Sequence, residues 1–189
     1  MNSILKAAVA ATLMLGASYA TAQDPGFYIG GSAGMSSVKD GCGVLPAGIT
    51  CDDKSTAWRG FAGYQIDKHF GIEAGYGRLA QFDASGPGGS AKITANAWEA
   101  SLIAGWPFTP QFSVYGRLGG YAANTKLSST VGISGNENTT DLTFGFGARF
   151  DFARQFAARL EWQRYNDVGG NTIGKSDISV IGVAGILKF

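Results

Sequence analysis

Cysteine, proline, histidine and net charge are all scarce in this 189-residue sequence. It has 2 Cys, 5 Pro and 1 His, and 15 Lys+Arg against 14 Asp+Glu give a formal net charge of +1. Binding to nucleic acid phosphates requires a clustered excess of Lys and Arg, so we expect no nucleic-acid partner. Two Cys without neighbouring His, and without a C-x-x-C pair, form no metal-binding or redox pattern, so we expect no metal and no cofactor.

Long hydrophobic runs are also missing, and no 18 consecutive residues are apolar. This excludes helical membrane spans but leaves room for a transmembrane β-barrel, whose strands are apolar only at alternate positions. Glycine is abundant, with 29 residues, and 12% of residues are aromatic. Glycine at about twice its usual share, together with few prolines and many apolar residues, fits neither collagen nor a disordered chain.

Residues 1–22 have the pattern of a secretory signal peptide. Lys6 supplies the positive charge, residues 7–16 form a short apolar segment, and Ala20-Thr21-Ala22 is an A-x-A cleavage site. We expect cleavage after Ala22 and a single mature domain over residues 23–189. Export permits a disulfide, and we expect Cys42 and Cys51 to staple a loop, which contributes about 2–3 kcal/mol in the chain-entropy estimate.

From Gly26 onward, segments of about ten residues alternate between apolar and polar side chains, which is typical of β-strands in a barrel. The clearest segment covers residues 142–152, and two more cover residues 98–106 and 156–163. Three tight connections fall near residues 67–69, 107–110 and 153–155. Four long ones, rich in Gly, Ser and Asn, fall near 37–56, 80–95, 124–141 and 166–177. Seven connections predict an all-β, eight-stranded antiparallel up-and-down barrel with its long loops at one end.

Alternation alone does not decide which face is inside, because a soluble lipocalin-like barrel would enclose its apolar face. The charged residues of the polar faces number five of each sign, which suits a closed interior where charges must be paired. They are Arg59, Arg117, Arg149, Arg159 and Lys188 against Asp67, Glu73, Glu99, Asp151 and Glu161. Trp98 and Trp106 share one face, roughly 26 Å apart along a strand, as expected for two aromatic girdles of a membrane barrel.

Three segments, GYQIDKHFGIEAGYGRL (63–79), GWPFTPQFSVYGRLGGY (105–121) and ARLEWQRYNDVGGNTIGKSD (158–177), resemble the N-terminal transmembrane domain of the OmpA family of outer-membrane proteins. The resemblance implies a bacterial outer-membrane location. It also implies that Phe189 is the terminal signal read by the assembly machinery, and that Glu73 and Arg159 pair near mid-barrel. In that family the pair exchanges partners with a lysine and a second glutamate, whose positions here hold Ile103 and Arg149.

Several motifs suggest chemistry that their context does not support. Residues 169–176, GGNTIGKS, match the P-loop pattern letter for letter, but the following residues alternate as a strand, whereas a phosphate cradle needs a helix there. His69 lies in a tight turn at the periplasmic end, where we expect a solvated rather than a catalytic histidine. Asn138-Thr139-Thr140 fits a glycosylation sequon, and we interpret it as a chance match.

The sequence therefore favours a monomeric, non-enzymatic outer-membrane barrel with a plugged polar interior and a structural role in the envelope. A narrow porin-like channel and an adhesin acting through the loops remain as alternatives, and a lipid-modifying enzyme is the least favoured. Expected partners are outer-membrane lipid and lipopolysaccharide, with the assembly machinery acting through Phe189.

Overall fold

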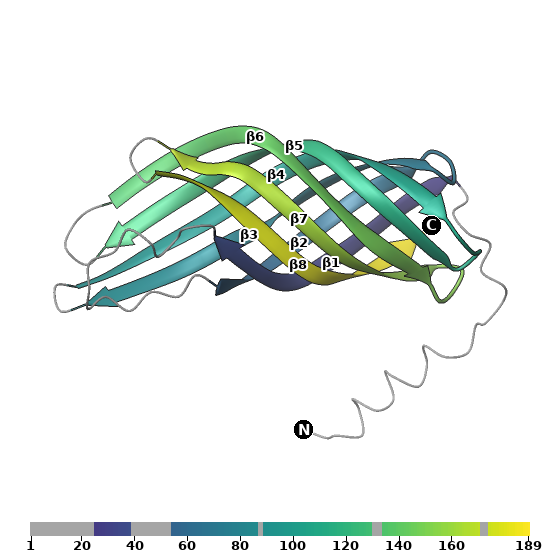
Figure 1. Ribbon diagram of the computed structural model, residues 1–189, viewed down its shortest axis with the longest axis horizontal. Helices are drawn as coiled ribbons and strands as arrows, with labels where there is room; N and C mark the ends of the chain where they lie inside the picture. The colour runs from purple at the N-terminus through teal and green to yellow at the C-terminus, as the bar shows by residue number, and fades with distance from the viewer. Residues whose placement is uncertain (1–24, 39–53, 87–88, 130–133, 171–173) are drawn as a thin grey trace, which may run out of the picture.

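The computed structural model describes residues 25–38, 54–86, 89–129, 134–170 and 174–189, and they form eight β-strands (Figure 1). The strands are β1 (Gly26–Val38), β2 (Lys54–Gln65), β3 (Phe70–Gly86), β4 (Gly89–Pro107), β5 (Phe112–Ser129), β6 (Ser134–Asp151), β7 (Phe156–Gly170) and β8 (Gly174–Lys188). The signal peptide expected over residues 1–22, and the pair Cys42 and Cys51, lie outside the described residues. Among these residues, no helix is long and apolar enough to cross a membrane.

Each strand pairs antiparallel with the next, and β1 pairs with β8, which closes the sheet into a barrel. At the closure, Gly31 of β1 is opposite Gly60 of β2 on one side and Gly185 of β8 on the other. A closed sheet leaves no unpaired strand edge. The predicted eight-stranded antiparallel barrel is confirmed.

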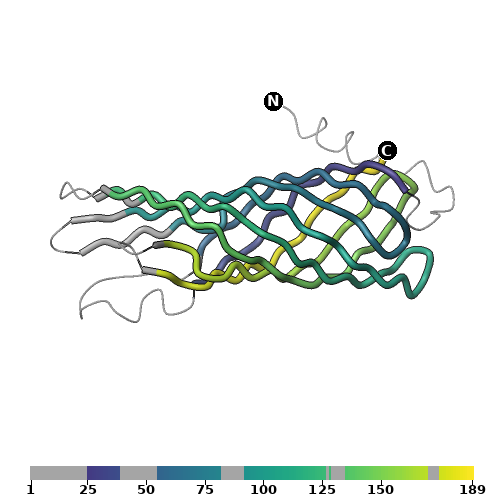
Figure 2. Tube along the Cα trace, turned by 90° about the horizontal axis from the view of Figure 1, so that it is seen from above, coloured from purple at the N-terminus to yellow at the C-terminus, as the bar shows by residue number. Residues whose placement is uncertain are grey.

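Tight turns join β2 to β3, β4 to β5 and β6 to β7, at the end of the barrel that also holds the C-terminus (Figure 2). In the first turn, Asp67 Oδ1 accepts hydrogen bonds from the backbone amides of His69 (2.7 Å) and Phe70 (2.8 Å). These two bonds lower the pKa of the Asp67 carboxyl below its usual value. By the arrangement of outer-membrane barrels, this is the periplasmic end.

At the opposite end, the strands run further than the sequence suggests. The predicted extent of three long loops is wrong, because the paired strands continue through most of each range. These ranges are residues 80–95, 124–141 and 166–177. Paired residues reach Gly86 opposite Gly89 in β3–β4, and Ser128 opposite Ser134 in β5–β6. Most of the described residues of these ranges therefore belong to hydrogen-bonded strand pairs rather than to open loops.

The side chains alternate between the lumen and the outer surface, and the apolar face points outward. Leu102 is 66% exposed and Phe146 is 62% exposed, whereas Glu99 and Arg149 are buried. The segments 98–106, 142–152 and 156–163 all have the predicted alternation, with the charged residues inside. A soluble barrel would have the reverse arrangement, so the apolar outer surface is one that a bilayer covers.

Candidate functional site

The charged residues expected in the interior come together at mid-barrel because each strand places every second side chain in the lumen. Six of them form one network that connects strands from all around the barrel. Its members are Arg59 of β2, Glu73 of β3, Glu99 of β4, Arg117 of β5, and Arg159 and Glu161 of β7. The three arginines and three glutamates balance in charge, and all six are buried.

Glu73 is the centre of this network. Arg159 Nη1 lies 2.6 Å from Glu73 Oε2, while Arg117 Nη2 and Arg59 Nη2 lie 3.1 and 3.4 Å from Glu73 Oε1. The hydroxyl of Tyr28 donates a further hydrogen bond to Glu73 Oε2 at 3.1 Å. A carboxylate shared by three guanidinium groups satisfies the requirement that a buried charge be paired and hydrogen-bonded.

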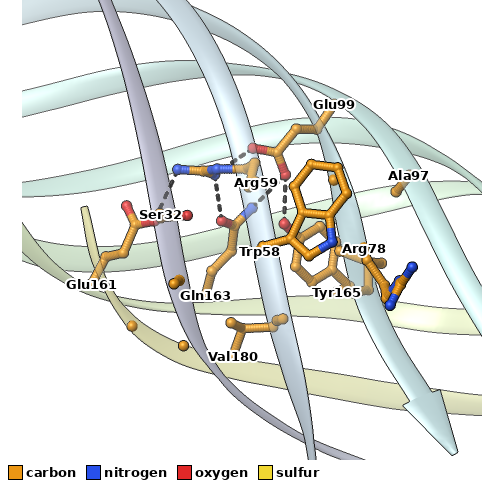
Figure 3. Close-up of a pocket in the computed structure, with 16 residues that line it drawn as sticks. Ser32, Trp58, Arg59, Arg78, Ala97, Glu99, Glu161, Gln163, Tyr165 and Val180 are labelled. Carbon is orange, nitrogen blue, oxygen red and sulfur yellow. Dashed lines mark hydrogen bonds and ion pairs between the residues drawn. The ribbon is translucent and has the colours of Figure 1, made fainter. Parts of the chain in front are cut away.

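Arg59 is held between the other two glutamates (Figure 3). Its guanidinium pairs with Glu99 and with Glu161, the latter at 2.9 Å, and donates to Gln163 Oε1 at 2.8 Å. Gln163 in turn donates to Glu99 Oε2 at 2.9 Å, and the Tyr165 hydroxyl donates to the same oxygen at 2.6 Å. The polar oxygens around Arg59 thus have donors from more than one strand, which fixes their positions.

Arg159 has a different environment from the other two arginines. Within the described chain, its one ion pair is with Glu73. Its guanidinium carbon otherwise lies 5.3 Å from the ring centre of Tyr28, 5.5 Å from that of Phe61 and 5.1 Å from that of Tyr115. These distances are within the range of cation–π contacts, which gain strength away from water.

A second charged group lies nearer the periplasmic end. Arg149 binds Asp151 through two nitrogens, at 2.9 and 3.0 Å, and Lys188 Nζ lies 2.6 Å from Asp151 Oδ1. The expected balance of five charges of each sign is wrong, because Asp67 lies in the exposed β2–β3 turn rather than on the interior face. Without Asp67 the predicted set has five basic and four acidic side chains, and the second charged group has two basic side chains against one acidic.

Of the four positions named from the OmpA resemblance, two pair within the central network and two lie outside it. Glu73 and Arg159 are paired, as the resemblance implies. Ile103 is buried on the inward face, and Arg149 belongs to the second charged group rather than to the central network. Alternation in the sequence places Gln163 on the inward face beside Arg159 and Glu161, but it does not predict that Gln163 and Tyr28 hydrogen-bond to the network.

Above the central network, on the extracellular side, a cluster of buried apolar side chains packs in the lumen. This apolar plug comprises Leu79, Ala80, Ala95, Ala97, Tyr121, Ala123, Tyr165, Val168 and Ile178. Next to it, a cavity of about 30 Å³ is lined by residues that include Ser32, Arg59, Glu99 and Gln163. A cavity of this size holds roughly two waters and is far smaller than a channel.

Trp98 and Trp106 belong to two of the aromatic groups on the outer surface. Near the extracellular side, Tyr76 lies between Trp58 and Trp98, at ring distances of 6.4 and 4.7 Å. Near the periplasmic turns, the ring centres of Trp106 and His69 are 5.4 Å apart, and His69 Nδ1 lies 3.0 Å from the carbonyl oxygen of Gly105. The structure thus places Trp98 and Trp106 in separate aromatic groups, one toward each end of the apolar surface.

The other sequence motifs lie on strands and hairpins. Gly169 of the P-loop-like segment pairs with Lys175 across the β7–β8 hairpin, so a strand stands where a nucleotide site needs a helix. Asn138 of the sequon lies on β6, where its side-chain oxygen accepts a hydrogen bond from Asn124 Nδ2 at 2.8 Å. Among the described residues, no three His, Cys, Asp or Glu side chains form a group that could hold a metal ion.

A closed eight-stranded barrel with an apolar outer surface and a paired, charged interior is a transmembrane β-barrel of the bacterial outer membrane. The comparison with protein families agrees. Residues 7–184 match the family described as outer membrane protein beta-barrel domain, so the chain belongs to this family.

Related proteins of known identity point the same way. Outer membrane protein A of Salmonella typhi is 31% identical over 160 residues, which cover 82% of this chain and 45% of that protein. Outer membrane protein A of Shigella dysenteriae is 31% identical over 179 residues, covering 89% and 51% of the two chains. The chain therefore spans about half the length of these curated relatives, and the resemblance to the OmpA barrel domain is confirmed.

Solved structures support the fold. Neisserial surface protein A superposes with a TM-score of 0.57 at 16% identity, over 86% of this chain and 97% of that one. Ail, the attachment invasion locus protein of Yersinia pestis, gives a TM-score of 0.55 at 18% identity, over 87% and 100%. At these identities the similarity concerns the fold alone.

Proposed function

We propose that the protein is a structural component of the outer membrane whose barrel is closed to diffusion. The observation that carries this proposal is that two buried layers of side chains lie one above the other in the lumen. The central network occupies mid-barrel, and the apolar plug packs above it on the extracellular side. An eight-stranded barrel is just wide enough for its own side chains to fill, so ion passage would require both layers to move.

Single-channel recording of refolded residues 23–189 in a planar lipid bilayer tests this proposal. We expect stable insertion without conductance steps. An Arg159→Ala variant serves as a comparison, because it removes a central guanidinium and leaves the apolar plug intact. Discrete openings in the wild-type protein, altered in the variant, would instead assign the lumen to a gated ion path.

A second candidate function is contact with other surfaces through the extracellular hairpins, and the strand lengths favour it. The 19 residues of β4 extend roughly 60 Å along the strand and about 45 Å after a tilt of about 40°. The apolar band of an outer-membrane barrel is only about 25 Å tall. Because the tight turns are at the periplasmic end, most of the excess length projects outward.

Shortening these hairpins tests the contact function separately from the closed barrel. A variant with residues 84–91 replaced by a two-residue turn keeps the transmembrane part of β3 and β4. Cells carrying this variant should lose adherence to host cells or to one another if the hairpins make the contacts. Unchanged adherence, with normal surface display, would remove the β3–β4 hairpin from this role.

A further inference from the structure

An apolar groove lies on the outer surface of the barrel, where β7, β8 and β1 run side by side (Figure 1). Its volume is about 500 Å³, and every side chain that lines it is apolar. The lining residues that shape it are Ile29, Phe152, Phe156, Ala158, Gly185 and Leu187. None of the six residues of the central network lines this groove.

Small residues form the floor of the groove and aromatic residues form one wall. Gly185 is paired with Gly31 on one neighbouring strand and with Ala158 on the other. The rings of Phe152 and Phe156 are stacked, with centres 6.2 Å apart and planes 11° from parallel. A Cβ added at Gly185 would meet no atom within 4 Å, so packing within the barrel does not require glycine there. Any larger side chain at this position would project into the groove.

One end of the groove reaches the periplasmic membrane boundary. The turn that joins its lining residues Phe152 and Phe156 carries Arg154, whose side chain is exposed. Within the described chain, no hydrogen bond or ion pair engages Arg154. A cation at the headgroup level, beside an apolar groove that extends into the membrane, complements a molecule with an anionic head and an acyl chain.

We propose that this groove binds one glycerophospholipid of the periplasmic leaflet, with an acyl chain lying along Gly185 and the phosphate at Arg154. The apolar surface lies in the membrane, where lipid covers all surface that protein leaves free. A second barrel is a poorer fit, because two convex cylinders meet along raised residues and leave a recess empty. The charge of Arg154 distinguishes the site from the general apolar surface.

Native mass spectrometry of the refolded protein in detergent, titrated with dioleoylphosphatidylglycerol, tests the proposal. The wild-type protein should retain one lipid in preference to further copies. Gly185→Leu, which fills the groove, should weaken this binding at least tenfold, and Arg154→Gln should weaken it about fivefold. Gly60→Leu is the matched control, because Gly60 also faces open space and does not line the groove. Its affinity should stay within twofold of the wild type.

Equal binding by the wild type and Gly185→Leu would overturn the site, as would an equal loss in Gly60→Leu. A dimer that disappears in Gly185→Leu while lipid binding is unchanged would assign the groove to a second copy of the chain. Folding of each variant is checked by the heat-dependent mobility shift on gels. Should Gly185→Leu not fold, Arg154→Gln decides, because its side chain lies in an exposed turn outside the barrel packing.

Discussion

Replacing Glu73 by Gln should destabilise the folded barrel by about 3 kcal/mol. The change removes the carboxylate on which three arginines converge, at 2.6 Å from Arg159, 3.1 Å from Arg117 and 3.4 Å from Arg59. Arg159 loses its one ion pair and becomes an uncompensated buried cation, for which the cost is about 3–5 kcal/mol. We expect a cost at the lower end of this range, because the glutamine oxygen still accepts a hydrogen bond and the aromatic rings around Arg159 remain in place.

Glu161→Gln is the matched control, because it makes the same chemical change in the same lumen. Its partners Arg59 and Arg117 both retain Glu73 and Glu99, so the cost should be about 1–2 kcal/mol. Urea unfolding of the proteins refolded into lipid vesicles, followed by tryptophan fluorescence, measures both free energies of unfolding.

The double variant Glu73→Gln/Arg159→Met separates pairing from packing. It removes one charge of each sign, and the Met side chain remains among Tyr28, Phe61 and Tyr115. We expect the double variant to be more stable than Glu73→Gln alone, by about 1–3 kcal/mol. The pairing would be refuted if the destabilisations caused by Glu73→Gln alone and by Arg159→Met alone summed to that of the double variant within about 0.5 kcal/mol.

Three further predictions concern the surface, the glycines and a turn. Leu160→Arg on the outer face should cost about 2–4 kcal/mol near the bilayer midplane and Phe152→Arg, beside a periplasmic turn, about 0–1 kcal/mol, in the same unfolding assay. Gly77→Ala places a Cβ 2.1 Å from a backbone oxygen and should cost about 1–3 kcal/mol, whereas Gly60→Ala should be near neutral; equal effects would contradict this. Because folding lowers the pKa of Asp67, its contribution to the β2–β3 turn is present at neutral pH and is lost as pH falls through the lowered pKa. The hydrogen-exchange protection factors of the His69 and Phe70 amides, measured against the intrinsic exchange rate at each pH, should therefore fall at low pH in the wild type and be low at all pH values in Asp67→Ala.

The strand number and the inward face could be predicted because both depend on alternation within single strands. A bilayer outside and a small lumen inside impose opposite polarities, so Phe144, Phe146 and Glu99 could be placed correctly without knowing their neighbours. The hairpin lengths could not be predicted in this way. Beyond the membrane, both faces of a strand contact water, and the alternation disappears although the backbone pairing continues.

The partners within the lumen depend on information that alternation does not contain. Glu73 and Arg159 are 86 residues apart in sequence and lie on β3 and β7, which are not adjacent in the sheet. Their contact is set by the stagger of all the intervening strands, which no local pattern specifies. Alternation also fails at the strand ends. It predicts Asp67 on the inward face, but β2 ends at Gln65, and the Asp67 carboxylate accepts hydrogen bonds from the backbone of the turn instead.

The contacts across the lumen also constrain how the chain can assemble. Arg159 of β7 pairs with Glu73 of β3, and Arg59 of β2 pairs with Glu161 of β7. The strands of each pair are not neighbours in the sheet, so these two ion pairs form only when the sheet closes into a barrel. An open sheet would lose these pairs across the lumen and keep only those between neighbouring strands, such as Arg59 with Glu73 and Arg117 with Glu99. Joining β1 to β8 therefore completes the charge pairing of the core, so the ion pairs across the lumen favour the closed barrel over a partly inserted one.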